Sequence, residues 1–452
     1  MSTEILLMGS WGDNAVQNEF DYAKKLEEYG HTVHFLSPRP SDDVAENLSG
    51  EFISLADSTQ SRLPTLKQLE REYKIPSIPH LYFTEMNYFA LSRSQAIDRT
   101  RRFAQLLTRM FETTNIDYVY QGRGGEIHRL LAHYFVQENG GANIWGEFSP
   151  FDNRVAFSSR LNGTWDSYET VPDEDISSAK RKTVDEYIES FRSQQKVYTH
   201  GNETGTTSRS IKDAVAGAVS SIKTVVTGTT PNNIRRYSAR KVRTAVNEKI
   251  NRRTVPTVAE SKEMCENNTF LFFPLQYPIE SRLTVFSPEF FDQAHIIDYI
   301  SRILPEGVKL FVKQHPNHPG QQSPAWTRQR EQNTQVEFLH PSFNAHKTIE
   351  HAEGVVVTNN TVGFEALFHT TPLVVLGRAF YEDVPAARHV SELSELPGEL
   401  SQAVNNSVEE RAVRSSIHSL REATYPVAPV EKKDERISTI ADALFSFIDE
   451  YA

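Results

Sequence analysis

The chain has 452 residues, which is too long for one ordinary domain and predicts two or three. Its formal net charge of -11 argues against nucleic acid as a partner, and its single cysteine, Cys265, excludes an intrachain disulfide framework and a cysteine-based metal site. No run of about 18 apolar residues occurs, and no basic region precedes the short apolar run at the N-terminus. We therefore expect a cytoplasmic protein that is at most peripheral at the inner face of the cell membrane.

The chain opens with a β-α-β pattern. Residues 4–8 form an apolar run typical of a strand, residues 16–29 have helical spacing, and residues 32–36 form a second apolar run. This order is typical of a Rossmann-type domain, although no GxGxxG motif is present. Residues 1–200 are therefore expected to form an N-terminal Rossmann-like domain.

Polar side chains follow two predicted strands of this first domain. Arg123 and Glu126 come after the strand at residues 116–120, and Glu147 comes after the strand at residues 143–145. In an open parallel sheet, the loops at the carboxyl ends of strands face the ligand crevice. These side chains are therefore expected to face that crevice.

The composition becomes basic between residues 208 and 253, where the only acidic residues are Asp213 and Glu248. Apolar residues recur there at multiples of four, which places an apolar stripe on a basic helix. One interpretation is a solvated linker helix packed on its own protein, and the other is contact with an anionic membrane surface. We expect residues 201–265 to form a basic helical insertion between the domains. The cations are Arg235, Arg236, Arg240, Lys241, Arg243, Lys249, Arg252 and Arg253, and the stripe is Ile234, Val242, Val246 and Ile250.

A second alternation of strands and helices predicts a C-terminal Rossmann-like domain over residues 266–452. Its strand at residues 308–312 runs into a loop that carries Lys313, His315 and His318. The predicted fold class is therefore α/β, with two facing Rossmann-like domains and a helical basic insertion between them.

A second loop of this domain has the geometry of a phosphate site. The strand at residues 355–358 turns through Asn359 and Asn360 into a helix, whose first backbone N–H groups have no intrahelical partners. Such a helix start binds anions. With the cationic and hydrogen-bonding side chains of the Lys313 loop, it predicts a nucleotide-phosphate pocket.

Three ordered stretches resemble the capsule polysaccharide biosynthesis family. FFPLQYPIESRLTVFSPEFFDQ is similar to its Pro-Leu-His/Gln loop, LFVKQHPNHPG to its Lys-x-His-Pro signature, and VVVTNNTVGFEALFHTTPLVVLGRAFY to its Asn-Ser-Thr-x-Gly-x-Glu-Ala helix and the strand after it. The family consists of inverting glycosyltransferases with two facing Rossmann-like domains, the GT-B architecture, and its best-known members transfer Kdo from CMP-Kdo. The resemblance covers roughly residues 269–381 and, more faintly, 116–152.

The resemblance implies an inverting transfer of a sugar from a nucleotide-activated donor to a surface polysaccharide or glycolipid acceptor, and a CMP-ulosonate-like donor is favoured. It also implies that residues 1–200 bind the acceptor and residues 266–452 bind the nucleotide-sugar. The partners expected are this nucleotide-sugar, the glycan or glycolipid, and an anionic membrane surface against residues 208–253, with no nucleic acid. Two alternatives stay open: a polyol-phosphate transferase resembling the teichoic-acid polymerases, and a non-catalytic scaffold of a polysaccharide assembly complex.

Departure of a nucleoside phosphate requires its negative charge to be neutralised. His315 is the side chain best able to donate a proton or hydrogen bond near neutral pH, and Lys313 supplies fixed charge. Asn360, Thr361 and Gly363 would present backbone N–H groups to phosphate, with Gly363 allowing close approach.

The remaining candidates bind the donor or activate the acceptor. Glu365 would accept from ribose hydroxyls, and Gln276 and Glu280 are candidates for base or sugar contacts. Inversion also needs a general base from the N-terminal lobe. For that role we expect Glu147, followed by Asp152 and Glu126. No cluster has the spacing of metal ligands, so we expect a metal-independent enzyme without a cofactor.

Overall fold

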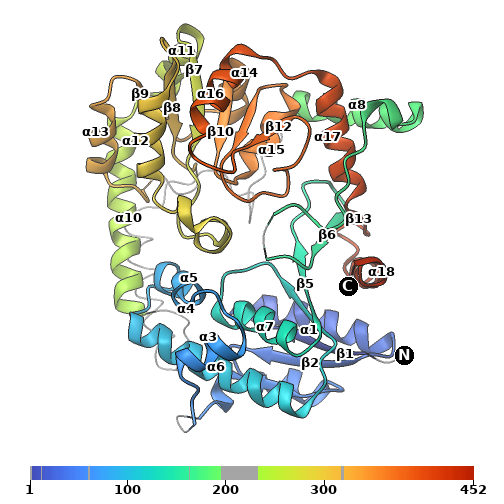
Figure 1. Ribbon diagram of the computed structural model, residues 1–452. Helices are drawn as coiled ribbons and strands as arrows, with labels where there is room; N and C mark the ends of the chain where they lie inside the picture. Colours follow the sequence, from blue (N-terminus) through green and yellow to red (C-terminus); the bar gives the residue numbers. More distant parts are fainter. Residues whose placement is uncertain are drawn as a thin grey trace.

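The computed structural model describes residues 3–11, 13–59, 62–161, 163–194, 233–316 and 320–451. Two domains lie one above the other, each built around a sheet of mostly parallel strands (Figure 1). This confirms the predicted α/β class with two Rossmann-like domains. His318 and the part of the basic stretch before residue 233 lie outside the described residues.

The N-terminal sheet has the strand order β13-β6-β5-β4-β1-β2-β3. Its parallel part reads 3-2-1-4-5, so the strand order reverses between β1 and β4, where a Rossmann-type sheet binds its ligand. Strands β6 and β13 extend the sheet in antiparallel fashion. The strands are β1 (Glu4–Met8), β2 (Thr32–Ser37), β3 (Phe52–Ser54), β4 (Tyr118–Gly122), β5 (Ala142–Glu147), β6 (Arg154–Ser158) and β13 (Tyr425–Pro426).

Helices cover this sheet because each has one apolar stripe to bury. The long helix α6 buries Phe103, Leu107 and Met110, and its start is closed by a capping box between Ser92 and Gln95. The helices of this domain are α1 (Asp13–Glu28), α2 (Asp42–Asn47), α3 (Leu66–Glu72), α4 (Ile78–Leu81), α5 (Phe83–Asn87), α6 (Arg93–Thr113) and α7 (Ile127–Glu138).

The C-terminal sheet is entirely parallel, in the order β12-β11-β10-β7-β8-β9. This is the Rossmann order 3-2-1-4-5-6, and its switch point lies between β7 and β10. Every residue of β7 and β10 is buried, as continuous apolar runs in a two-sided parallel sheet require. The strands are β7 (Phe270–Pro274), β8 (Lys309–Lys313), β9 (Val336–Leu339), β10 (Gly354–Val357), β11 (Leu373–Val375) and β12 (Ala387–His389).

Helices flank this second sheet as well. The helix α15 follows β10 directly and buries six consecutive residues, Gly363 to Phe368. The helices are α11 (Val258–Asn267), α12 (Gln293–Ile303), α13 (Pro324–Glu331), α14 (Ala345–His351), α15 (Thr361–Phe368), α16 (Leu396–Asn405) and α17 (Glu410–Glu422).

Two helices pack on the domain opposite to the one that their sequence position predicts. Helix α8 (Ser178–Gln194) buries Ile188 and Phe191 in the core of the C-terminal domain. The last helix, α18 (Lys433–Tyr451), buries Leu444 and Phe447 against the N-terminal sheet. The range 1–200 therefore gives up α8, and the range 266–452 gives up α18 and the strand β13. An apolar stripe shows that a helix packs but not on which sheet.

Helix α10 (Ile234–Thr254) runs along one edge of the molecule and joins the two domains (Figure 1). At its start, Arg240 donates to the carbonyl groups of Asn87 and Tyr88 in the N-terminal domain. Near its end, Asn247 donates to the Gly320 carbonyl over 3.2 Å and Asn251 to the Gln322 carbonyl over 2.9 Å. The described part of the basic stretch is thus a linker helix packed on its own protein. None of the described helices is long and apolar enough to cross a membrane.

Candidate functional site

The loop between β7 and α12 lies where the two domains meet. Its π-helical turn at residues 282–286 packs on the N-terminal domain, with Val285 and Phe286 inside that domain's apolar core. The Thr284 hydroxyl lies 2.7 Å from that of Thr84, and His80 Nε2 lies 3.1 Å from the Val285 carbonyl. The loop of the first predicted motif therefore couples the C-terminal switch point to the N-terminal domain.

Lys313 ends β8 and is 6% exposed. Its carbonyl accepts from Leu275 N–H over 2.9 Å, which fixes the strand end beside the loop after β7. Burial lowers the pKa of its amine to about 8, and the nearby Glu365 carboxylate opposes this only in part. Among the described residues, Nζ has no hydrogen-bond or ion-pair partner. A buried cation without such a partner is costly and needs an explanation.

Arg282 is a second cation at this place, and the sequence analysis did not identify it. Its guanidinium lies near Tyr381 and Glu280, and burial lowers its pKa. No salt bridge or hydrogen bond of this guanidinium occurs within the described part of the chain. The only sequence signal was an arginine two residues after Glu280, and an arginine on a loop is ordinarily solvated.

Arg123 approaches Arg282 from the N-terminal domain. Burial and the charge of Arg282 lower the pKa of the Arg123 guanidinium to about 9. Arg123 lies over the Phe286 ring at 4.8 Å and donates to the Leu161 carbonyl. The two arginines bring like charges together between the domains, which an anion would relieve.

Glu147 forms an ion pair with Arg123, and its side chain is 9% exposed. Arg123 and Glu147 pair because they follow the neighbouring strands β4 and β5. A carboxylate neutralised in this way is a weak base, and its burial separates it from an acceptor hydroxyl. The placement therefore speaks against Glu147 as the general base.

Of the two other predicted carboxylates, Asp152 is exposed, and Glu126 lies at the start of α7. A Cβ on Gly125 would lie 2.7 Å from Val285 Cγ2, so the residue before Glu126 packs against the loop after β7. Arg129 Nε lies 3.6 Å from Glu126 Oε2. Glu126 is thus the best placed of the three carboxylates.

A polar cluster that the sequence analysis missed adjoins Glu126 at the β1/β4 switch point. The Ser10 hydroxyl donates to Glu19 over 2.6 Å, and Arg129 donates to both residues. Burial raises the pKa of Glu19. The sequence signal for this cluster was the pair Gly9-Ser10 directly after β1. Small residues at the end of this strand are typical of a Rossmann-type crevice.

His315 is partly exposed, with its ring 6.3 Å from that of Tyr277 on the loop after β7. Gln314 beside it is buried, and its side-chain oxygen accepts from Asn251 on α10 over 3.4 Å. The loop of the second motif is thus held by the helix that joins the domains.

The start of α15 carries the third motif. Asn360 is the N-cap residue, but its amide donates to the Pro274 carbonyl over 2.9 Å and makes no cap bond. Gly363 is a glycine because a Cβ there would lie 2.5 Å from the Tyr381 hydroxyl. The close approach at Gly363 is therefore to Tyr381, where the sequence analysis expected a ligand. Thr361 is partly buried.

Buried acceptor oxygens without a hydrogen-bond partner gather at the ends of β7 and β10. Over 90% of buried polar groups in proteins are bonded, so several unpaired ones at one place mark a functional region. Within the described ranges they are Gln276 Oε1, Thr358 Oγ1, Asn359 Oδ1 and Asn360 Oδ1.

The predicted donor-binding side chains are more buried than expected. Gln276 Nε2 donates to Glu280 Oε2 over 2.5 Å, and burial raises the pKa of Glu280. Glu365 is 1% exposed and lies beside Lys313, with Oε2 at 3.9 Å from His346 Nε2. Glu365 therefore faces protein cations and imidazole, and in this conformation it does not reach a ribose.

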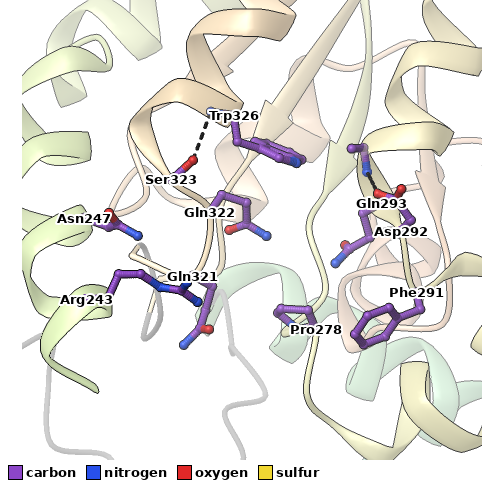
Figure 2. Close-up of a pocket in the computed structure, with 11 residues that line it drawn as sticks. Arg243, Asn247, Pro278, Phe291, Asp292, Gln293, Gln321, Gln322, Ser323 and Trp326 are labelled. Carbon is purple, nitrogen blue, oxygen red and sulfur yellow. Dashed lines mark hydrogen bonds between the residues drawn. The ribbon is translucent and has the colours of Figure 1, made fainter. Parts of the chain in front are cut away.

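A cavity of about 360 Å³ adjoins the loop after β8. Figure 2 shows Arg243 and Asn247 of α10 on one side of it, Phe291 and Gln293 on the other, and Trp326 above. Gln293 also bonds both backbone groups of Gln276, so the cavity backs onto the donor loop. The amides and aromatic rings that line this cavity could hold a polar ring of a ligand by hydrogen bonds and stacking.

Within the described ranges, one group of three side chains is as close together as the ligands of a metal ion would be. Their spacing in the sequence did not indicate this. One ligand atom each of Glu382, Asp383 and His389 lies within 4.8 Å of the others. The Glu382 carboxylate already accepts from the Ala379 N–H over 2.7 Å and from Arg378 over 3.2 Å. Asp383 accepts from Thr164 of the N-terminal domain, so these bonds hold the domains together.

The unpartnered Lys313 predicts an unusual gain in stability. Replacement by methionine removes the buried charge, and we expect Lys313→Met to raise the free energy of unfolding at pH 7 by about 1–3 kcal/mol. The pKa of the Lys313 amine is lower in the folded protein than in the unfolded chain. Above about pH 8, the unfolded chain therefore binds more protons than the folded protein does. Wild-type stability should therefore gain a contribution as pH rises from about 8 to 10.5, and the variant should lack it.

Urea unfolding at several pH values measures this. The matched control is Lys309→Met on the same strand, because Lys309 is paired with Glu337 and should lose stability or stay unchanged. If Lys313→Met were less stable than wild type at pH 7, the Lys313 amine would have hydrogen-bond or ion-pair partners in solution.

Comparison with known proteins identifies one family. Residues 227–385 match the family described as "Capsule polysaccharide biosynthesis protein". No curated protein matches the chain in sequence.

Solved structures give weaker likenesses. The β-Kdo 2,7 transferase of Thermosulfurimonas dismutans KpsC is 12% identical, with a TM-score of 0.34, over 82% of this chain and 96% of that one. Its β-Kdo 2,4 transferase is 9% identical, with a TM-score of 0.34, over 67% and 79%. A glycosyltransferase from Rickettsia africae is 8% identical, with a TM-score of 0.30, over the whole of both chains. Scores of this size carry no argument about activity.

The family match spans the basic linker helix, the loop after β7, the Lys313 loop and α15. It contains all three motifs that the sequence analysis singled out. Over residues 227–385 the chain is therefore similar to the capsule polysaccharide biosynthesis family, as those motifs predicted.

Proposed function

We propose that this protein is an inverting glycosyltransferase that moves a sugar from a nucleotide-activated donor to a surface polysaccharide or glycolipid acceptor. The observation that carries the proposal is a pair of cations at the switch point of the C-terminal sheet, the buried Lys313 and the partly buried Arg282. Neither side chain has a hydrogen-bond or ion-pair partner among the described residues. A donor phosphate would supply the missing negative charge. The family match to capsule polysaccharide biosynthesis supports the same substrate class, and a CMP-ulosonate-like donor remains the preferred one.

In this proposal, Lys313 and Arg282 neutralise the charge that develops on the leaving phosphate. His315 donates a hydrogen bond or proton to it, and the N–H group of Thr361 at the start of α15 completes the anion site. The Gly363 N–H is instead donated to the Asn360 carbonyl over 3.2 Å. Preorganised charges of this kind stabilise the transition state because they are oriented before the reaction begins. The cavity beside the loop, with its amides and Trp326, would hold a polar ring of the donor.

We propose Glu126 as the general base, in place of Glu147. An inverting displacement needs the base on the face of the sugar opposite to the leaving phosphate, and so on the N-terminal domain. Glu126 follows Gly125, which packs against the donor loop. Glu126 Oε2 lies 3.6 Å from Arg129 Nε without a hydrogen bond, whereas Glu147 is paired directly with Arg123. Metal independence also belongs to the proposal, because side-chain cations and a helix start would meet the phosphate charge.

Nucleotide binding and transfer can be separated by two variants. In a thermal-shift screen against CMP, CDP, UDP and GDP, one nucleotide at about a hundred times its Kd should stabilise the protein by about 2.7 kcal/mol. Arg282→Gln should lose this shift, because it removes a cation from the phosphate. Glu126→Gln should keep the shift and lose transfer by roughly a hundredfold or more.

Glu147→Gln is the matched control for Glu126→Gln and should retain the larger part of the transfer activity. If Glu147→Gln alone lost transfer, Glu147 would be the general base, as the sequence analysis expected. A phosphorylated product in place of a glycoside would identify a polyol-phosphate transferase. Failure of all four nucleotides to bind the intact protein would favour a scaffold.

We further propose that the outer face of α10 contacts an anionic membrane surface. The side of α10 turned away from both domains carries cations around two apolar side chains, Val246 at 39% and Ile250 at 40% exposure. Glu248, the acidic residue of this helix, is buried and bonded to Arg252. Such a face is complementary to anionic lipid. The outward cations are Arg235, Arg236, Lys249 and Arg253.

Sedimentation with phosphatidylglycerol vesicles measures this contact. Each cation near the surface contributes about 1 kcal/mol, so replacing the four outward cations by glutamine should abolish binding at low salt. In wild type, high salt should weaken binding by screening. The control replaces the exposed Lys182, Lys262 and Arg411, which lie on other helices or loops and should not matter. Equal sedimentation of all three proteins would refute the surface.

A further inference from the structure

The turn that carries Arg282 is a single π-helical turn, a rare geometry that occurs often at functional sites. It spans Arg282–Phe286 and is closed by the Ser287 N–H, which donates to the Arg282 carbonyl over 3.1 Å. The same turn places Val285 and Phe286 in the core of the N-terminal domain. Turns of this kind usually lie inside a longer α-helix, and here they do not, so we expect contacts from outside the turn to hold it.

Asn359 bonds this turn at both of its ends. It follows β10 by two residues, and its side chain is fully buried. Nδ2 donates to the Arg282 carbonyl over 2.8 Å and to the Ser287 hydroxyl oxygen over 3.0 Å. The two N–H groups of the amide are therefore both used, one at the first residue of the turn and one at the residue after its last.

The orientation of the Asn359 amide follows from these partners. A backbone carbonyl can only accept a hydrogen bond, so the atom that faces the Arg282 carbonyl is the amide nitrogen and not the oxygen. A leucine at this position would have a similar size but would leave the Arg282 carbonyl without its side-chain donor. Asparagine thus supplies two donors on a short side chain that brings no charge into the interior.

The Ser287 hydroxyl also bonds a third loop, the one after β11. Its Oγ accepts from the Arg378 N–H over 2.9 Å, and Ser287 is fully buried. Gly377 leaves the space for this contact, because a Cβ there would lie 2.4 Å from Ser287 Oγ. The loops after β7, β10 and β11 are therefore joined at one buried place, at the carboxyl edge of the C-terminal sheet.

We propose that Asn359 is a positioning residue, whose amide fixes the π-helical turn and so holds Arg282 in place before the donor phosphate binds. A cation that is already ordered binds an anion more tightly, because binding then does not have to order it. Both N–H groups of Asn359 are used within the protein, so Asn359 acts through Arg282. The inference deepens the proposed function and rests on it for the role of Arg282.

Hydrogen–deuterium exchange of the nucleotide-free protein measures whether Asn359 holds the turn. The readout is a peptide that covers residues 282–287, followed by mass spectrometry and corrected for the intrinsic exchange rate of each sequence. In Asn359→Leu both donors are lost, and we expect about tenfold faster exchange of this peptide, as the loss of a buried hydrogen bond predicts. If Asn359 only fills space, the leucine variant exchanges like wild type, and the proposal is wrong.

The matched control is Thr371→Val, which removes a buried hydroxyl at the other edge of the same sheet. Thr371 lies just before β11, and its Oγ1 donates to the Ile349 carbonyl over 3.1 Å. This variant should also lose stability in urea, but it should leave the exchange of the 282–287 peptide unchanged. Equal acceleration in Thr371→Val and Asn359→Leu would show a general loosening of the domain and would overturn the proposal.

A second variant, Ser287→Ala, keeps the test decisive if Asn359→Leu does not fold. It removes the acceptor at one end of the turn and leaves the bond between Asn359 and the Arg282 carbonyl in place. We therefore expect a smaller effect, about threefold faster exchange. Wild-type exchange in Ser287→Ala would contradict the proposal.

A double-mutant cycle measures whether Asn359 acts through Arg282. With the nucleotide among CMP, CDP, UDP and GDP that binds wild type, Asn359→Leu should raise the Kd about tenfold. In an Arg282→Gln background, measured at raised nucleotide concentration, the same substitution should change the Kd by less than about twofold, because the cation is gone. An equal loss in both backgrounds would show a purely structural role and refute the proposal. If none of the four nucleotides binds wild type, the proposed function fails, and the exchange result still decides whether Asn359 holds the turn.

Discussion

The burial of two cations at the switch point of the C-terminal sheet is the constraint on which the site depends. Lys313 is buried and Arg282 is partly buried where β7, β8 and β10 end, and within the described ranges neither has an ion pair. Folding tolerates such a cost where function requires it, and a phosphate ligand would offset it.

The two domains are coupled at the same place. The loop after β7 carries Arg282 and inserts Val285 and Phe286 into the N-terminal core, so a ligand bound to the loop would act on both domains. On the opposite side, Asn247 and Asn251 of α10 hold the loop that follows His315. The linker helix is therefore part of the site's support, and a membrane bound to its outer face would lie one helix away from the donor loop.

Much of the fold could be predicted from the sequence, because the buried strands of a parallel sheet appear as apolar runs and polar loops follow their carboxyl ends. That placed Lys313 and His315 correctly at the end of β8. The pairing of Glu147 with Arg123 depends on the neighbouring ends of β4 and β5, and the burial of Glu365 depends on α14, so local patterns revealed neither. Arg282 was missed because only the packing of its loop shows that it is unsolvated.

The central claim is that Lys313 binds a phosphate of the donor. The number of protons that the protein takes up when the nucleotide binds tests this claim most directly. A bound phosphate should raise the pKa of the amine from about 8 to well above 9. Titration calorimetry of the nucleotide at pH 8.5, in buffers of different ionisation enthalpy, should then show uptake of roughly 0.7 proton by wild type and close to none by Lys313→Met. Binding without proton uptake by wild type, or equal uptake by both proteins, would contradict the account.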